Sequence, residues 1–106
     1  MGKQIGKATA AQIKEWKAKH KDVRVLTQTD EDGNVHYTYI RKPKIEDSSF
    51  AASVGDGDGV KIGLAIVNAV RLGGSDVVME DDQLKQGIMR SVLSLVKPIQ
   101  AEIAKL

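Results

Sequence analysis

Apolar side chains are concentrated in the second half of the chain, where they predict two helices. Residues 60–72 read VKIGLAIVNAVRL, and a helix that is apolar on nearly every side must be covered on most of its surface. Asp58 is placed to cap the start of this helix, and Gly73-Gly74 is a strong signal for its end. The rest of the chain is therefore expected to supply part of its cover.

A second apolar stripe predicts a long closing helix over residues 82–106. The acidic residues 80–82 stand at its start, where carboxylates complement the helix dipole. Its apolar positions recur at intervals of three and four: Leu84, Ile88, Val92, Leu95, Ile99 and Ile103. Pro98 lies inside the stripe and predicts a kink or a break there.

The first half of the chain predicts a short helix followed by a β-hairpin. Thr9 and Gln12 have the spacing of a capping box, so a helix is expected over residues 10–20, docking through Ile13 and Trp16. Strands are expected near residues 23–29 and 34–42, joined by a turn at Asp32-Gly33. Alternation would place Val35, Tyr37 and Tyr39 on one face of the second strand and His36, Thr38 and Ile40 on the other.

These elements predict an α+β fold: an N-terminal helix, a β-hairpin and then a mainly helical C-terminal half. Residues 1–7 are expected to be a flexible tail, and residues 8–106 a single domain. Residues 45–54 are the least defined segment, where Asp47 or Ser48 is placed to cap a helix that the GDGDG run at 55–59 would end.

Composition excludes several kinds of chemistry. The chain has no cysteine, which removes disulfides, thiolate metal sites and cysteine nucleophiles. The serines lack a GxSxG motif, the two histidines lack further ligands, and the acidic-glycine runs match neither a calcium loop nor a phosphate loop. We therefore expect no enzymatic activity, no metal and no cofactor. The longest apolar stretch is too short to span a membrane.

Charge is uneven along the chain. Residues 1–45 contain ten basic and five acidic residues, and residues 46–106 contain six and nine. The basic half suggests contact with nucleic acid or with an acidic partner, but the chain has only four aromatic residues on which bases could stack. We therefore keep nucleic-acid binding as an alternative to protein binding.

The candidate interaction surface consists of Trp16, Tyr37 and Tyr39 in the first half and Ile99 and Ile103 near the end. Tryptophan and tyrosine are favoured where proteins bind each other. The alternative interpretation is that these few aromatic side chains belong to a small core. An open edge of the hairpin is a further place where another chain could pair.

The order of elements and four short strings resemble the small tail assembly chaperones of long-tailed phages and prophages. The strings are TAAQIKEWKAKH, YTYIRKP, LGGSD and EDDQL. The resemblance implies a non-enzymatic protein in the cytoplasm of a bacterial host, which binds the tape-measure protein during tail assembly and can self-associate. It carries over no catalytic residue. The alternative is a nucleic-acid-binding accessory protein of a mobile element that uses the basic N-terminal half.

Overall fold

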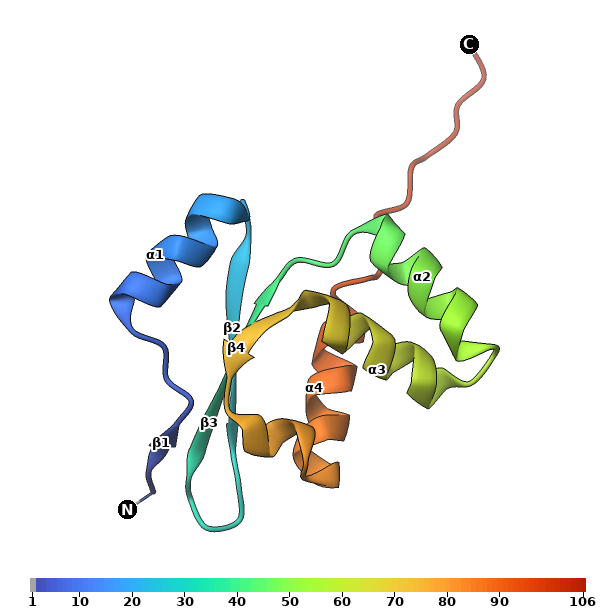
Figure 1. Cartoon of the computed structure of the whole chain (residues 1–106). Helices are drawn as coiled ribbons and strands as arrows, with labels where there is room; N and C mark the ends of the chain where they lie inside the picture. Colours follow the sequence, from blue (N-terminus) through green and yellow to red (C-terminus); the bar gives the residue numbers. More distant parts are fainter. Residues whose placement is uncertain (1) are drawn as a thin grey trace.

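A four-stranded sheet forms the centre of the structure, a computed structural model that describes residues 2–106. The hairpin strands β2 (Val23–Thr29) and β3 (Val35–Arg41) pair antiparallel along their whole length. The other edge of β3 is shared by two short strands (Figure 1). β1 (Gln4–Ile5) pairs with its start in parallel, and β4 (Arg71–Gly74) pairs with its second half antiparallel.

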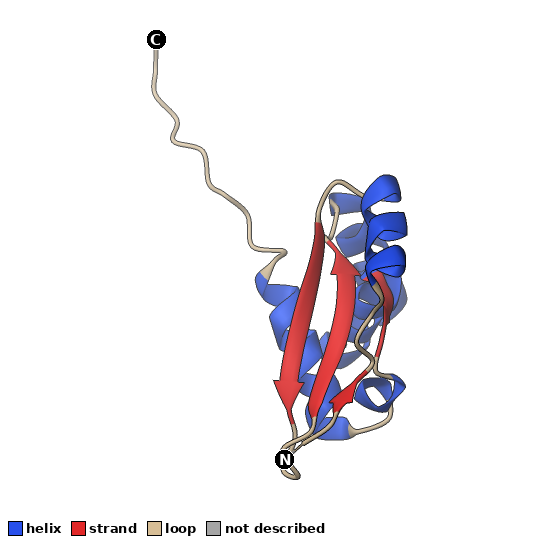
Figure 2. Cartoon of the chain, turned by 90° about the vertical axis from the view of Figure 1, so that its left-hand side faces the viewer, coloured by secondary structure: helices blue, strands red, loops and turns tan. Residues whose placement is uncertain are grey.

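Helices cover both faces of this sheet, so the predicted α+β class is confirmed. α1 (Ala10–Lys19) lies on one side, and α3 (Gly59–Val70) and α4 (Asp82–Ser94) lie on the other (Figures 1 and 2). α2 (Ile45–Gly55) packs on α3 and lies farther from the sheet, while the short helix η1 (Asp76–Met79) leads from β4 into α4.

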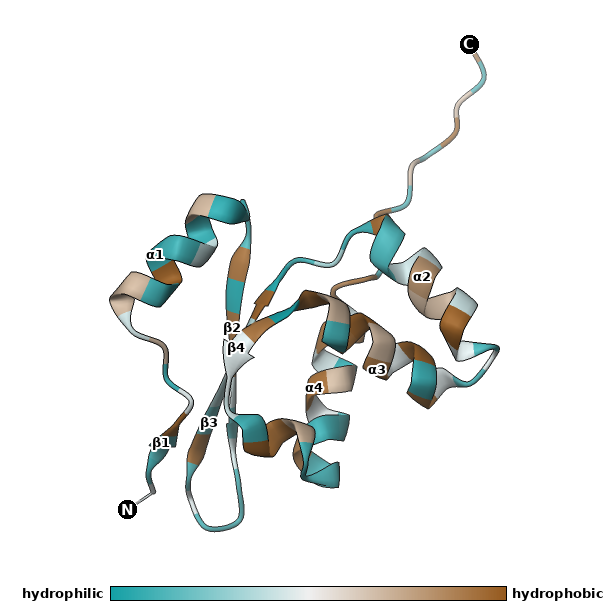
Figure 3. Ribbon diagram, in the orientation of Figure 1, coloured by the Kyte–Doolittle hydropathy of each residue, from teal (hydrophilic) through white to brown (hydrophobic). Residues whose placement is uncertain are grey.

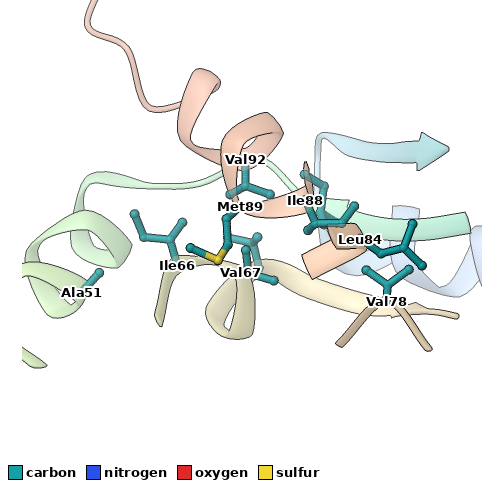
Figure 4. Close-up of a cluster of buried hydrophobic side chains, with 10 residues drawn as sticks. Ala51, Ile66, Val67, Val78, Leu84, Ile88, Met89 and Val92 are labelled. Atoms are coloured by element: carbon teal, nitrogen blue, oxygen red, sulfur yellow. The ribbon is translucent and has the colours of Figure 1, made fainter. Parts of the chain in front are cut away.

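The hydrophobic core lies between the sheet and the helices α3 and α4, and its side chains are aliphatic. Figure 4 shows most of the core residues. In Figure 3, much of the α3 ribbon has the colour of hydrophobic residues. The fully packed residues are Ile40, Ala51, Ile66, Val67, Val70, Val78, Leu84, Ile88, Met89 and Val92. The predicted alternation along β3 holds, since Ile40 enters this core while Tyr39 contacts Trp16 of α1.

Side-chain caps fix the starts of three helices where the sequence predicts them. The Thr9 hydroxyl accepts a hydrogen bond from the backbone N–H of Gln12 at 3.2 Å, completing the capping box of α1. The Asp58 carboxylate caps α3, and Asp81 caps α4 through the N–H of Leu84 at 3.0 Å. α2 begins at Ile45, earlier than a cap at Asp47 or Ser48 would give.

The predicted end of the apolar helix at Gly73-Gly74 is wrong. α3 ends at Val70, and the chain continues in an extended conformation from Arg71 as β4. The two glycines serve strand pairing. A Cβ on Gly73 would lie 2.9 Å from the Trp16 ring, and one on Gly74 would lie 2.2 Å from the Tyr37 carbonyl oxygen. Only glycine allows β4 to approach both so closely.

The predicted helix over residues 82–106 is shorter than expected, and the chain leaves the helical conformation just before Pro98, near which a kink or a break was predicted. α4 ends at Ser94, and the N–H groups of Leu95 and Val96 turn back to carbonyl groups only three residues earlier. Pro98 disfavours the helical conformation for Lys97, the residue that precedes it. Residues 97–106 have no secondary structure and run away from the body of the molecule (Figure 1).

The first seven residues are not wholly a tail, because Gln4 and Ile5 form β1. The Lys3 carbonyl accepts a hydrogen bond from the N–H of Val35 at 2.8 Å, and the Asn34 side chain accepts one from the N–H of Lys3 at 2.9 Å. Among the residues that the structure describes, no helix is both long enough and apolar enough to cross a membrane.

Candidate interaction surfaces

The aromatic part of the predicted surface holds α1 against the sheet. The rings of Trp16 and Tyr39 lie 5.2 Å apart, and Tyr37 stacks on Tyr39 at 6.4 Å. The Tyr39 hydroxyl accepts a hydrogen bond from the N–H of Ala8 at 3.1 Å. Tyr39 is only 5% exposed and has no surface to offer a partner, whereas Trp16 and Tyr37 are half-buried. This arrangement matches the alternative interpretation of a small core.

The aliphatic part of the predicted surface is fully open to solvent. Ile99 is 99% and Ile103 is 100% exposed, and Leu106 beyond them is equally exposed. These three residues lie on the extended segment 97–106, on the other side of the sheet from α1 (Figure 1). The structure therefore does not bring the five candidate residues together into one surface.

A second exposed apolar surface lies on α2 and was missed from the sequence. Phe50 is 60% and Val54 is 49% exposed, whereas Ala51 and Gly55 are buried. In Figure 3, α2 is the helix farthest from the sheet and its ribbon has hydrophobic stretches. The missed signal was that the helix has a side of small residues, Ala51 and Gly55, that suits close packing, and a side of large apolar residues, Phe50 and Val54, that does not.

A basic hollow of about 510 Å³ lies where the end of α1 meets the loop after β3. The two segments that line the hollow, residues 19–22 and 41–44, are far apart in the sequence, and the pairing of Val23 with Arg41 brings them together. Arg41 is paired with Asp47, and Asp22 with Arg24. Lys19 is paired with Glu15, so the positive charge of the hollow comes mainly from Lys21, Lys42 and Lys44.

Three polar side chains meet at the opposite end of the hairpin in the order Asp30, His36, Ser75. One imidazole nitrogen of His36 lies 2.8 Å from an Asp30 carboxylate oxygen, and the other lies 2.9 Å from the Ser75 hydroxyl. His36 is 1% and Ser75 is 2% exposed. The residue types are those of a serine hydrolase triad, but a buried hydroxyl has no access to a substrate. The cluster instead ties β4 and the hairpin turn to the sheet.

Sequence reasoning treated His36 as a strand residue without partners, because nothing in the linear pattern joins residues 30, 36 and 75. The hydrogen bond from His36 is the main cause that lowers the pKa of Asp30, with further donation from the N–H groups of Asn34 and Asp32. Within residues 2–106 no group of three or more potential ligands is arranged to hold a metal ion.

An ion pair between Arg41 and Asp47 fixes α2 to the end of the sheet. The guanidinium donates two hydrogen bonds to the carboxylate, at 2.7 and 2.8 Å, and a third to the Ala69 carbonyl at the end of α3 at 3.2 Å. The same carboxylate accepts a bond from the N–H of Lys44 at 2.7 Å. Both charged side chains are largely buried, at 17% and 12% exposed. The hydrogen bonds from Arg41 are the main reason that the pKa of Asp47 is lowered.

Asp47→Asn should lower the free energy of unfolding at pH 7 by about 2 kcal/mol, because charge-assisted hydrogen bonds to a buried carboxylate are lost. The pKa of Asp47 is lowered in the folded state, so its stabilisation is present above the unfolded pKa of about 4 and disappears as the pH falls through the lower folded value. Urea titrations at several pH values should show the two proteins converging in acid. Glu46→Gln removes an exposed neighbouring charge and is the control. An equal loss in both variants would contradict the prediction.

Comparison with protein-family models, with curated proteins and with solved structures found no match for this chain. A proposal for the function of this chain therefore rests on its fold and on these surfaces.

Proposed function

We propose that this chain is a non-enzymatic protein-binding subunit that holds an apolar helical client through residues 97–106. One observation carries the proposal. Ile99, Ile103 and Leu106 are fully exposed, and they are spaced by four and three residues on a segment that has no secondary structure. This is the spacing of the anchors that an amphipathic helix places in a groove of its partner.

The segment has the properties of an element that folds on binding. α4 ends at Ser94, four residues before Pro98, and proline is favoured in the first turn of a helix, so a separate helix starting at Pro98 is compatible with the sequence. Burial of each large aliphatic side chain contributes about 1.5–3 kcal/mol, and ordering each residue of the segment costs about 1–2 kcal/mol. The three anchors therefore do not offset the cost of ordering the whole segment by themselves, and further contacts with the client must supply the difference. Such a balance favours the weak and reversible binding that a chaperone requires.

The resemblance to tail assembly chaperones suggests the client, a phage tape-measure protein in the cytoplasm of the bacterial host. Such a client is a very long helical chain, and long helices present apolar stripes before they assemble. The three anchors of residues 97–106 would cover a part of such a stripe.

Co-expression of the chain with a long helical protein encoded by a neighbouring gene tests the proposal. We expect the chain to raise the soluble fraction of that protein, and Ile99→Asp combined with Ile103→Asp to abolish the effect without changing the thermal stability of the domain. Gln100→Asp combined with Ala104→Asp adds the same charges at the same spacing on a different side of the segment, and this control should retain the effect. Equal activity of the two double variants would refute the role of the anchors.

Nucleic-acid binding remains the second candidate, and the basic hollow favours it. The hollow gathers lysines from two distant segments, as expected of a surface that contacts phosphate groups. No tryptophan, tyrosine or phenylalanine is among its lining residues, and the imidazole of His20 is the one aromatic ring there on which a base could stack. Retardation of oligonucleotides at low salt, lost when Lys42 and Lys44 are changed to glutamate, would support this function. Its complete absence at low salt would eliminate it.

A further inference from the structure

We propose that residues 97–106 of one copy fold as a helix onto the Phe50–Val54 face of α2 in a second copy. The inference rests on the binding role proposed above for residues 97–106, and it names a partner for that segment when no client is present. Self-association would then shield the apolar side chains of the segment until a client displaces the second copy.

α2 is anchored along one side and open along the other. Its buried side is made of Ala51 and Gly55 and faces α3, where a Cβ on Gly55 would lie 2.3 Å from the Ile62 side chain. Phe50 and Val54 are one helical turn apart and remain about half exposed or more. Two large apolar side chains at this spacing form a ridge that a second helix can pack against.

The charges of the two segments are complementary. Residues 45–59 contain four acidic residues and no lysine or arginine, and Asp47 is already paired with Arg41. Glu46 and Asp56, near the two ends of α2, are exposed. Residues 97–106 carry Lys97 and Lys105 near their own two ends, with one acidic residue, Glu102, between them. Each end of a docked helix would therefore place a lysine beside a carboxylate.

The two elements also match in length and direction. α2 has 11 residues, and a helix over residues 98–106 would be about 14 Å long at 1.5 Å per residue, slightly shorter than α2. Antiparallel packing aligns the two helix dipoles favourably and places Ile99 opposite Val54 and Ile103 opposite Phe50. In both views the segment leaves its own domain and points into solvent, so it meets a second copy without reversing its course (Figures 1 and 2).

Disulfide trapping in the full chain tests this arrangement, since the chain has no cysteine of its own. Val54→Cys protein is mixed with isotope-labelled Ile99→Cys protein under mild oxidation, and the mixed dimer is quantified by mass spectrometry. The control replaces Val54→Cys with Ser49→Cys, an exposed position on another side of α2. We expect several-fold more mixed dimer from the first pair, because docking raises the local concentration of the two thiols.

Sedimentation analysis provides the second readout. The unmodified chain should sediment as an oligomer in a concentration-dependent manner, and Phe50→Asp should shift it to the monomer. Equal trapping of both cysteine pairs, or a chain that stays monomeric at every concentration, would overturn the inference. Phe50→Asp also separates the two proposals, because it leaves residues 97–106 intact. If this variant still solubilises the client while self-association is absent from the unmodified chain, only the second-copy inference falls.

Discussion

Gly74→Ala is expected to lower the free energy of unfolding by about 3 kcal/mol, a large share of the roughly 5–15 kcal/mol that holds a domain of this kind together. Gly74 has φ of +126°, outside the region that residues with a side chain readily adopt. Its added Cβ would also lie 2.2 Å from the Tyr37 carbonyl oxygen and 2.9 Å from the Thr38 Cα. Since both atoms belong to the backbone of β3, relief requires β4 to move away from the sheet.

Gly57→Ala separates the two causes of this loss. Gly57 also has a positive φ, of +82°, but nothing lies within 4 Å of a Cβ built there. It should therefore lose only the conformational part, about 1 kcal/mol. Urea denaturation of both variants measures the difference. If Gly74→Ala is no less stable than Gly57→Ala, the close approach of β4 to β3 is not what requires glycine at this position.

The Gly73-Gly74 pair also shows where sequence reasoning about the fold fails. A double glycine after an apolar helix is a common C-cap, and the neighbouring residues give no signal for a strand. What decides its role is the Trp16 ring, 57 positions earlier in the chain, and the backbone of β3. In contrast, Thr9, Asp58 and the Asp32-Gly33 turn act on their immediate neighbours, and the helix starts and the hairpin that they predict are confirmed.

The candidate surfaces also combine features that have a local sequence signal with features that depend on tertiary contacts. The helical spacing of Ile99 and Ile103 was visible in the sequence, but spacing alone did not reveal that α4 ends at Ser94 and leaves both exposed. The exposed face of α2 depends on which side of that helix α3 covers, and this is a tertiary contact. The pairing of β1 with β3 has no local signal, because two residues are too few for a strand pattern.

His36→Ala is expected to lower the free energy of unfolding by about 3 kcal/mol, through the space left by the ring and the loss of a partner for the buried Ser75 hydroxyl. His36 is 1% exposed and bonded through both ring nitrogens, so it joins three parts of the chain: the hairpin turn at Asp30, β3, and the start of η1 at Ser75. His20→Ala is the control, because His20 is half-buried at the end of α1 and makes no side-chain hydrogen bond within residues 2–106.

The pH dependence gives the His36 prediction a second test. Because His36 is the main cause that lowers the pKa of Asp30 in the folded state, the stabilisation from Asp30 is present above the unfolded pKa of about 4 and is lost as the pH falls through the lower folded value. Without the imidazole that lowering should diminish, so the stability of His36→Ala should fall less steeply below pH 4 than that of the unmodified chain. Urea titrations between pH 7 and pH 3 measure both slopes. Parallel slopes, or a loss no larger than that of His20→Ala, would show that the Asp30–His36–Ser75 cluster does not fasten the hairpin turn and the start of η1 to the sheet.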